Sequence, residues 1–332
     1  MAKLLPLWTN DFLLFIAVEL VTVPFSNVLL RYRVGHQQNN GQLRGLLTDQ
    51  LYGIPTFLKT VQRIHNIEGV AGFYKGFFAR LIELFIFTFV FKIAFGFHPA
   101  ILPIKLLYTY PDFTLLQCLI YYGSTVLISV PMKVFITRST TTRFRLSQAD
   151  PSHEQAHAFK VLLSPTEHQN PLALYLIPGL FTCIALQTLF SFISLATIYH
   201  LIQFYLSHGQ PGWVRKRARI VYIVLFLMSR ALVYTPFEVV ACRLAVMGQS
   251  ERDDGAAVDM ADLEATKAGD EESETEMVPT FSLENVIQLR ENVVESDSYE
   301  GFRDCVIKIR REEGFSALFR GWLGSLVGTV CI

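Results

Sequence analysis

The chain has 332 residues, no net formal charge and a mean hydropathy of +0.35, with 51% hydrophobic and 17% charged residues. Soluble domains usually contain about 25% charged residues, so this composition argues against a soluble protein and indicates a membrane protein. The charge is unevenly distributed: residues 250–277 contain eleven acidic and two basic residues, and the rest of the chain is therefore basic. A basic body suits anionic solutes or lipid headgroups, and basic residues beside membrane helices are equally the usual topological signal.

The first hundred residues predict two apolar helices with an amphipathic helix between them. The first apolar run extends over residues 12–33 and is too long for a signal-peptide core, so we expect it to remain in the mature protein. The amphipathic segment covers residues 55–67 and ends at Glu68-Gly69, which is a helix-stop pattern. The second apolar helix is expected over residues 76–97.

The rest of the chain predicts three more long apolar helices and a short one. The long helices are expected over residues 113–138, 179–206 and 220–247, and each exceeds the roughly 20 residues that cross a bilayer. A further amphipathic helix is expected over residues 299–312. The last apolar segment, residues 317–332, would form a helix of about 24 Å, which is shorter than a hydrocarbon core of about 30 Å.

Glycines give this last segment one smooth face. They are Gly321, Gly324 and Gly328, at spacings of three and four residues. Small residues in such a pattern let helices approach closely in lipid. We therefore expect the short helix to pack by this face against the first or the fifth apolar helix.

A proline followed seven residues later by an arginine recurs in the first, third and fifth apolar helices. The successive prolines are 107 and 105 residues apart, which indicates an internally triplicated protein whose helices kink at proline. The pairs are Pro24 with Arg31, Pro131 with Arg138, and Pro236 with Arg243.

The spacing divides the chain into three repeats, which cover residues 1–105, 106–208 and 209–332. The third repeat contains an insertion at about residues 248–297 that includes the acidic stretch. Such a stretch cannot bury enough apolar surface to order itself, so we expect the insertion to be disordered. An acidic loop of this kind is either a solvated insertion or a site for a basic partner.

These repeats resemble those of the mitochondrial carrier family, in which each repeat holds a proline-kinked helix, an acid-glycine step and a second spanning helix. The resemblance implies an all-α membrane protein, a threefold pseudo-repeated helical bundle of five long transmembrane helices and a short sixth. The second repeat lacks the acid-glycine step and retains Pro178-Gly179. The first and third repeats supply Glu68-Gly69 with Gly76, and Glu313-Gly314 with Gly321.

The chain departs from the family at its gate positions. The resemblance implies an acid two residues after each proline and a base five residues after it, which pair to close the cavity. No repeat retains both the acid and the base of a family pair. The positions two residues after proline hold Ser26, Lys133 and Glu238, and those five residues after hold Leu29, Ile136 and Ala241.

This loss of the gates is typical of the degenerate carrier-like proteins of the mitochondrial outer membrane, which include a fungal fusion factor. The resemblance therefore favours a non-transporting scaffold or adaptor for mitochondrial fusion or lipid handling, with dynamin-type GTPases or lipids as partners. The alternative is a solute carrier of the inner membrane with atypical gates and a small-molecule substrate. A third reading is an insertase-like role, because a broken bundle opens a polar groove to lipid.

Several charged residues are candidates for sites. Glu19, Glu83 and Lys92 lie within apolar spans, where ionisable groups are costly and either line a cavity or snorkel to the interface. Lys133 and Glu238 either pair across the floor of the cavity or are separately solvated.

The three arginines that follow the prolines lie at one depth around the pseudo-threefold axis. They form either a basic ring that holds an anionic group or anchors whose charged ends lie in interfacial water. The second interpretation is favoured, because Tyr32 and Arg33 beside Arg31 already indicate an interfacial helix end.

No motif predicts an enzyme. The sequence shows no Ser/His/Asp arrangement, no glycine-rich phosphate loop and no metal-ligand spacing among its eight histidines or five cysteines. We therefore expect no catalytic activity, no cofactor, no metal and no nucleic-acid partner.

Overall fold

The structure of the chain is a computed structural model. It describes residues 5–36, 46–95, 115–142, 162–207, 217, 220–221, 224–225, 228–247, 286–287, 289–290 and 298–325. These residues form helices and no strands, so the predicted all-α class is confirmed for the described part of the chain.

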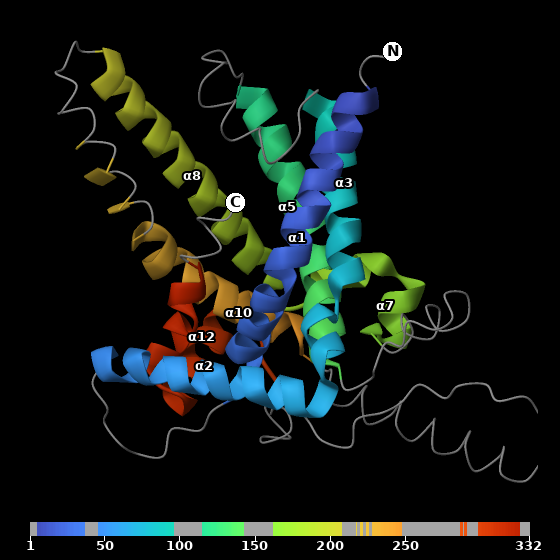
Figure 1. Cartoon of the computed structure of the whole chain (residues 1–332), viewed down its shortest axis with the longest axis vertical. Coiled ribbons are helices and arrows are strands. Elements are labelled where there is room, and N and C mark those ends of the chain that lie inside the picture. The colour runs from blue at the N-terminus through green and yellow to red at the C-terminus, as the bar shows by residue number, and fades with distance from the viewer. Residues whose placement is uncertain are drawn as a thin grey trace, which may run out of the picture.

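The first third of the chain contains two long helices with a surface helix between them. Helix α1 (Leu5–Val34) begins earlier than expected and continues through Pro24. Helix α2 (Leu46–Glu68) lies across the lower ends of the other helices (Figure 1). The 3-10 turn η1 (Val70–Tyr74) then leads into α3 (Phe77–Phe95), which contacts α1.

The middle third again contains two long helices, with short helical turns before the second of them among the described residues. Helix α5 (Leu115–Thr141) contacts α1 and α3 and continues through Pro131. The short helix α7 (Pro165–Gln169) and the 3-10 turn η2 (Pro171–Leu176) directly precede α8 (Leu180–Ser207). Helix α8 contacts α5 near its start and diverges from it toward its other end (Figure 1).

The last third contains a shorter proline helix. A π-helical turn, η3 (Arg230–Tyr234), runs directly into α10 (Thr235–Ala245), in which Pro236 occupies the first turn. Proline has no N–H to donate, and a π turn at this point accommodates the missing hydrogen bond. The amphipathic α12 (Phe302–Glu312) and the 3-10 turn η4 (Phe315–Phe319) follow.

The final apolar segment does not become α-helical where the sequence predicted. Residues up to Phe319 are in the 3-10 turn, and α-helix begins only after Gly321. The described helix ends at Ser325, so Gly328 and the predicted length of this segment lie outside the described residues.

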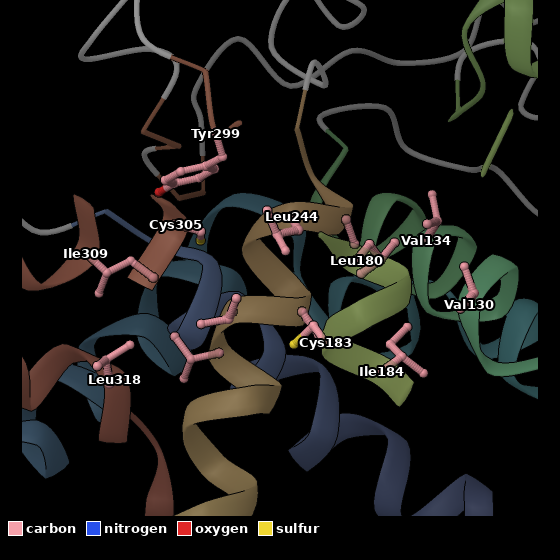
Figure 2. Packing of buried hydrophobic residues seen from close by; sticks show 14 of the residues in the cluster. Val130, Val134, Leu180, Cys183, Ile184, Leu244, Tyr299, Cys305, Ile309 and Leu318 are labelled. Carbon is pink, nitrogen blue, oxygen red and sulfur yellow. The ribbon is translucent and has the colours of Figure 1, made fainter. Parts of the chain in front are cut away.

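Figure 2 shows the larger of two buried apolar clusters, which joins α5, α8, α10 and α12. Val130, Leu180 and Leu244 are completely or almost completely buried there, and so are the free cysteines Cys183 and Cys305. Burying one such aliphatic side chain stabilises the fold by about 1.5–3 kcal/mol. This cluster therefore joins the second repeat to the third.

One helix of the described residues, Leu119–Thr141, is long and apolar enough to cross a membrane. Leu180–Ser194 is a shorter apolar helix.

Three glycines make the same backbone turn at the start of three helices. Gly76, Gly179 and Gly321 have φ angles of +80°, +78° and +76°, in the left-handed region that favours glycine. Gly69 and Gly314, which follow α2 and α12, also have positive φ angles. At each of these positions of the predicted motif, glycine is therefore favoured because the backbone has a positive φ angle.

The glycine face of the last segment packs against α1, which confirms the prediction for the described glycines. A Cβ atom at Gly321 would lie 2.4 Å from Cδ1 of Leu29, and one at Gly324 would lie 2.7 Å from both Leu29 methyl groups. The helix that follows Gly321 can therefore approach α1 closely only because these positions lack side chains.

Substituting Gly324 tests this close approach. We expect Gly324→Leu to destabilise the protein by about 1–3 kcal/mol, because Leu29 is buried and cannot move aside freely. The additional change Leu29→Ala should restore part of the loss. Thermal unfolding of the detergent-solubilised protein measures both effects, and an unchanged midpoint for Gly324→Leu would contradict the packing.

Candidate functional site

The three arginines that follow the prolines are buried, which overturns the favoured interpretation. Arg31, Arg138 and Arg243 are 1%, 2% and 4% exposed. Their guanidinium groups therefore do not lie in interfacial water. Tyr32 and Arg33 indicated a helix end at the membrane interface. The sequence did not show that other parts of the fold cover this end.

Each arginine forms an ion pair with a glutamate of its own repeat. Arg31 Nη1 lies 2.6 Å from Glu68 Oε2. Arg138 donates from Nη1 and Nη2 to the carboxylate of Glu167, at 2.7 and 3.1 Å. The arginines therefore do hold anionic groups, as the first interpretation predicted, and these groups are carboxylates of the protein itself.

The third pair has the same form. Arg243 donates from both Nη atoms to Glu313, with 3.0 Å from Nη2 to Oε2. Parallel hydrogen bonds of this kind are the strongest that arginine makes with a carboxylate.

The arginines also join neighbouring repeats in a closed cycle. The Nε atom of each arginine donates to a main-chain carbonyl of the next proline helix. The accepting residue lies nine positions after the proline of that helix. The three bonds run from Arg31 to Thr140 at 2.8 Å, from Arg138 to Ala245 at 2.9 Å, and from Arg243 to Arg33 at 3.2 Å. The ends of α1, α5 and α10 are thus fastened together in a ring, which we call the arginine ring.

A second set of bonds reinforces two of the three junctions. Lys75 Nζ donates to Glu68 at 3.0 Å and to the carbonyl of Thr142. Arg320, in the equivalent position before Gly321, donates to Glu313 and to the carbonyl of Gly35. The middle repeat has Pro178 at this position, and proline has no such side-chain donor.

Sequence reasoning missed Glu167, because it sought an acid followed by glycine. A different signal marks it. Ser164 and Glu167 form a capping box, in which each backbone N–H donates to the other residue's side chain, at 2.8 and 3.2 Å. The S-x-x-E pattern, together with an arginine that needed a partner, could have identified this glutamate.

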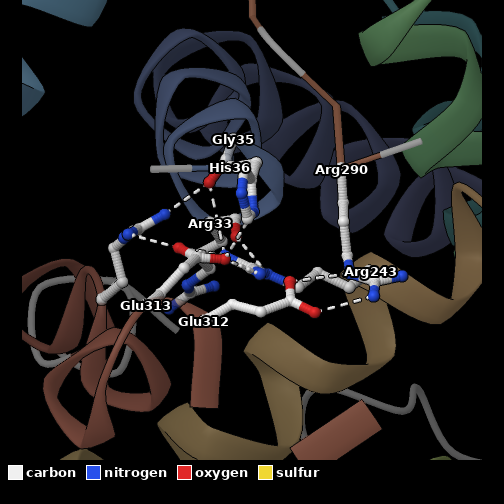
Figure 3. Close-up of polar contacts among 8 residues, drawn as sticks. Arg33, Gly35, His36, Arg243, Arg290, Glu312 and Glu313 are labelled. Atoms are coloured by element: carbon white, nitrogen blue, oxygen red, sulfur yellow. Dashed lines mark hydrogen bonds and ion pairs between the residues drawn. The ribbon is translucent and has the colours of Figure 1, made fainter. Parts of the chain in front are cut away.

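Glu313 has the most cationic surroundings of the three glutamates (Figure 3). Its side chain is fully buried and contacts Arg243, Arg320 and Nδ1 of His36, the last at 3.1 Å. Burial alone would raise the pKa of this carboxyl. Hydrogen bonds from His36 and Arg243 and the charges of Arg243 and Arg320 outweigh it, so the pKa lies well below its ordinary value.

The lowered pKa of Glu313 predicts how stability depends on pH. A carboxyl whose pKa is lower in the folded state contributes stability that is fully present above its ordinary pKa of 4.5 and is lost as the pH falls toward the folded value. We expect the difference in unfolding midpoint between the wild type and Glu313→Gln to be constant from pH 7 to 5 and to shrink below 4.5. A difference that grew on acidification would contradict this assignment.

Lys133 and Glu238 are paired, as one of the two interpretations predicted. They form a direct ion pair between α5 and α10, and Gln187 of α8 donates to the other oxygen of Glu238 at 2.7 Å. Arg33 Nη1 lies 3.6 Å from the same carboxylate. Ser26 instead donates to the carbonyl of Val23 within its own helix.

The interior acids lie near this pair. Glu83 on α3 is close enough to interact electrostatically with Glu19, Arg80, Lys133 and Glu238. Glu19 and Glu83 are both half-buried. The side chain of Lys92 lies outside the described residues.

The arrangement joins helices through buried ion pairs and hydrogen bonds. Among the residues that the structure covers, no group of three His, Cys, Asp or Glu side chains could hold a metal ion. The charged groups of the arginine ring form ion pairs with one another, and each Nε atom donates to a main-chain oxygen.

Comparison with known proteins finds no match to a protein-family model, and no characterised protein is significantly similar to the chain.

Proposed function

We propose that this chain is a membrane-embedded bundle of three carrier-type repeats that acts as a non-transporting scaffold or adaptor. In this proposal it resides in the mitochondrial outer membrane and takes part in fusion or lipid handling, with dynamin-type GTPases or lipids as its partners. The observation that carries the proposal is the arginine ring, which fastens the ends of α1, α5 and α10 to one another through buried bonds.

Exposed apolar side chains support a membrane environment. Helix α3 exposes one stripe of large apolar residues at helical spacing, and α1, α5 and α8 also expose large apolar residues. Monomeric soluble proteins rarely expose such continuous apolar surface. The α3 stripe consists of Phe78, Ile82, Phe85 and Phe89.

The bonds of the arginine ring support the proposal that this end of the helical bundle stays closed. A carrier that alternates access must break the contacts at each end of its bundle in every cycle. Removing one partner of a buried ion pair costs about 3–5 kcal/mol, and here the same arginines also bond main-chain carbonyls of the neighbouring helix. A cycle of three such junctions would oppose opening far more strongly than a layer of exposed ion pairs, each of which contributes about 0–1 kcal/mol.

The runner-up is an inner-membrane solute carrier with atypical gates. The observation that favours it is the pair between Lys133 and Glu238, which joins α5 and α10 from gate positions. The polar interior around Glu83 could then hold a solute. However, one ion pair does not replace the ring of three acid–base pairs that the resemblance implies for a transporting carrier.

Transport distinguishes these functions. The purified protein, reconstituted in liposomes loaded with candidate metabolites, is expected to show no saturable exchange. The physical reason is that breaking the buried ion pairs of the arginine ring costs a large free energy. Reproducible counter-exchange of any solute, abolished by Lys133→Ala and unaffected by the exposed change Arg303→Ala, would reject the scaffold in favour of the carrier.

Location tests the other half of the proposal. An epitope placed within residues 250–277 reports which compartment this acidic stretch faces. For a protein of the outer membrane facing the cytosol, protease should remove the epitope from intact mitochondria. Protection until the outer membrane is ruptured would overturn the proposed location.

A further inference from the structure

A short segment outside the helices inserts a leucine where the three proline helices end. Leu289 is 8% exposed and belongs to the smaller of the two buried apolar clusters. Ile287 packs against the same cluster. The other buried members of the cluster are Leu30 and Val34 of α1, Ile136 of α5, and Cys242 and Val246 of α10 and its end.

This cluster lies at the end of the bundle where the arginine ring joins α1, α5 and α10. Helices α1, α5 and α10 contact one another pairwise, and the cluster contains buried side chains from all three, so it lies between them. Val34 is the last residue of α1, and Val246 directly follows α10. The cluster is therefore at the level of the arginine ring, and Leu289 fills part of its interior.

Arg290 fastens the same segment to α12. Its Nε and Nη2 atoms donate to the two carboxylate oxygens of Glu312 at 2.8 and 2.7 Å. Its guanidinium group lies 4.8 Å from the centre of the Tyr299 ring, and the residue is 6% exposed. Figure 3 shows Arg290 beside Glu312 and Arg243.

We propose that Ile287, Leu289 and Arg290 form an intramolecular plug, which closes the axial end of the bundle between α1, α5 and α10. The apolar side chains fill the centre of the arginine ring, and the ion pair with Glu312 holds them there. The plug belongs to the stretch at 248–297 that interrupts the third repeat. It closes the end whether or not the protein transports a solute.

The plug is separable from the rest of the core. Leu289 belongs to the smaller cluster, whereas Cys183 and Cys305 lie in the larger cluster of α5, α8, α10 and α12. Loss of the plug should therefore expose the centre of the ring while the larger cluster stays packed. Cys242, which is fully buried in the smaller cluster, reports on that centre.

The buried free cysteines of the described residues, Cys183, Cys242 and Cys305, allow each variant to be compared within one molecule. The full-length protein in detergent is treated with N-ethylmaleimide, and the labelling rate of each cysteine is followed by mass spectrometry. For Leu289→Asp we expect the labelling rate of Cys242 to rise about tenfold or more, because a buried leucine is replaced by a charge. Cys183 and Cys305 should keep their wild-type rates, and the conservative change Leu289→Met should leave all three protected.

A charge exchange tests the fastening of the plug. Arg290→Glu should expose Cys242 in the same way, because two carboxylates would then oppose each other. The double change Arg290→Glu with Glu312→Arg should restore protection of Cys242, whereas Arg290→Glu with the exposed change Arg311→Glu should not.

Two results would overturn the proposal. If Cys242 stays protected in Leu289→Asp, the segment does not close the centre of the ring. If all three cysteines become labelled at equal rates in both Leu289→Asp and Arg290→Glu, the segment is an inseparable part of the core and not a plug.

Discussion

Replacing Glu313 by glutamine is expected to lower the unfolding free energy by about 3–5 kcal/mol, because it leaves buried cations without their counter-ion. The carboxylate is fully buried and forms ion pairs with both Arg243 and Arg320. Glutamine keeps the size of the side chain and removes its charge. The loss should appear as a marked fall in the thermal unfolding midpoint of the detergent-solubilised protein.

Matched substitutions separate this effect from a general loss of charge. Glu300, an exposed glutamate near the start of α12, is the control, and Glu300→Gln should change the stability by no more than about 0.5 kcal/mol. Glu68→Gln should also destabilise the protein, because Glu68 is the buried counter-ion of Arg31 and Lys75. Equal stabilities of the Glu313→Gln and Glu300→Gln proteins would show that the arginine ring does not hold the bundle together.

A single methyl group at Gly179 is expected to destabilise the protein by about 2–5 kcal/mol, from backbone strain and overpacking together. The residue has a φ angle of +78° and begins the turn into α8. A Cβ atom there would lie 2.0 Å from the backbone nitrogen of Phe302 and 2.7 Å from the carbonyl carbon of Gly301. Neither backbone atom can move without displacing the start of α12.

Two other glycines separate the sources of this loss. Gly69 has a φ angle of +69° and open space around its Cβ direction, so Gly69→Ala should cost only the strain of about 1–2 kcal/mol. Gly123, within α5, has neither a positive φ angle nor a neighbour within 4 Å, so Gly123→Ala should stabilise the helix by about 0.5–1 kcal/mol. If Gly179→Ala were no worse than Gly69→Ala, α8 and α12 would not be in the close contact that we describe.

The sequence by itself determined the helical class, the recurrence of proline and arginine, and the glycines at the helix starts. These features depend on local physics, namely apolar runs, the missing N–H of proline and the positive φ angles that glycine tolerates. The same local signals placed α1, α3, α5, α8 and α12 within a few residues of their observed ends, apart from the early start of α1. They could not show that the last segment begins in a 3-10 turn.

Only the tertiary structure decided what the repeated arginines do. An arginine near the end of an apolar helix has the same local sequence whether it lies in interfacial water or in the core. The difference arises from partners far along the chain, such as Glu167, 29 residues from Arg138, and the Thr140 carbonyl, 109 residues from Arg31. Leu289 lies within a stretch predicted to be disordered from its composition, and its burial depends on three helices whose ends meet there. Burial and partner choice depend on contacts between distant segments, which local patterns do not record.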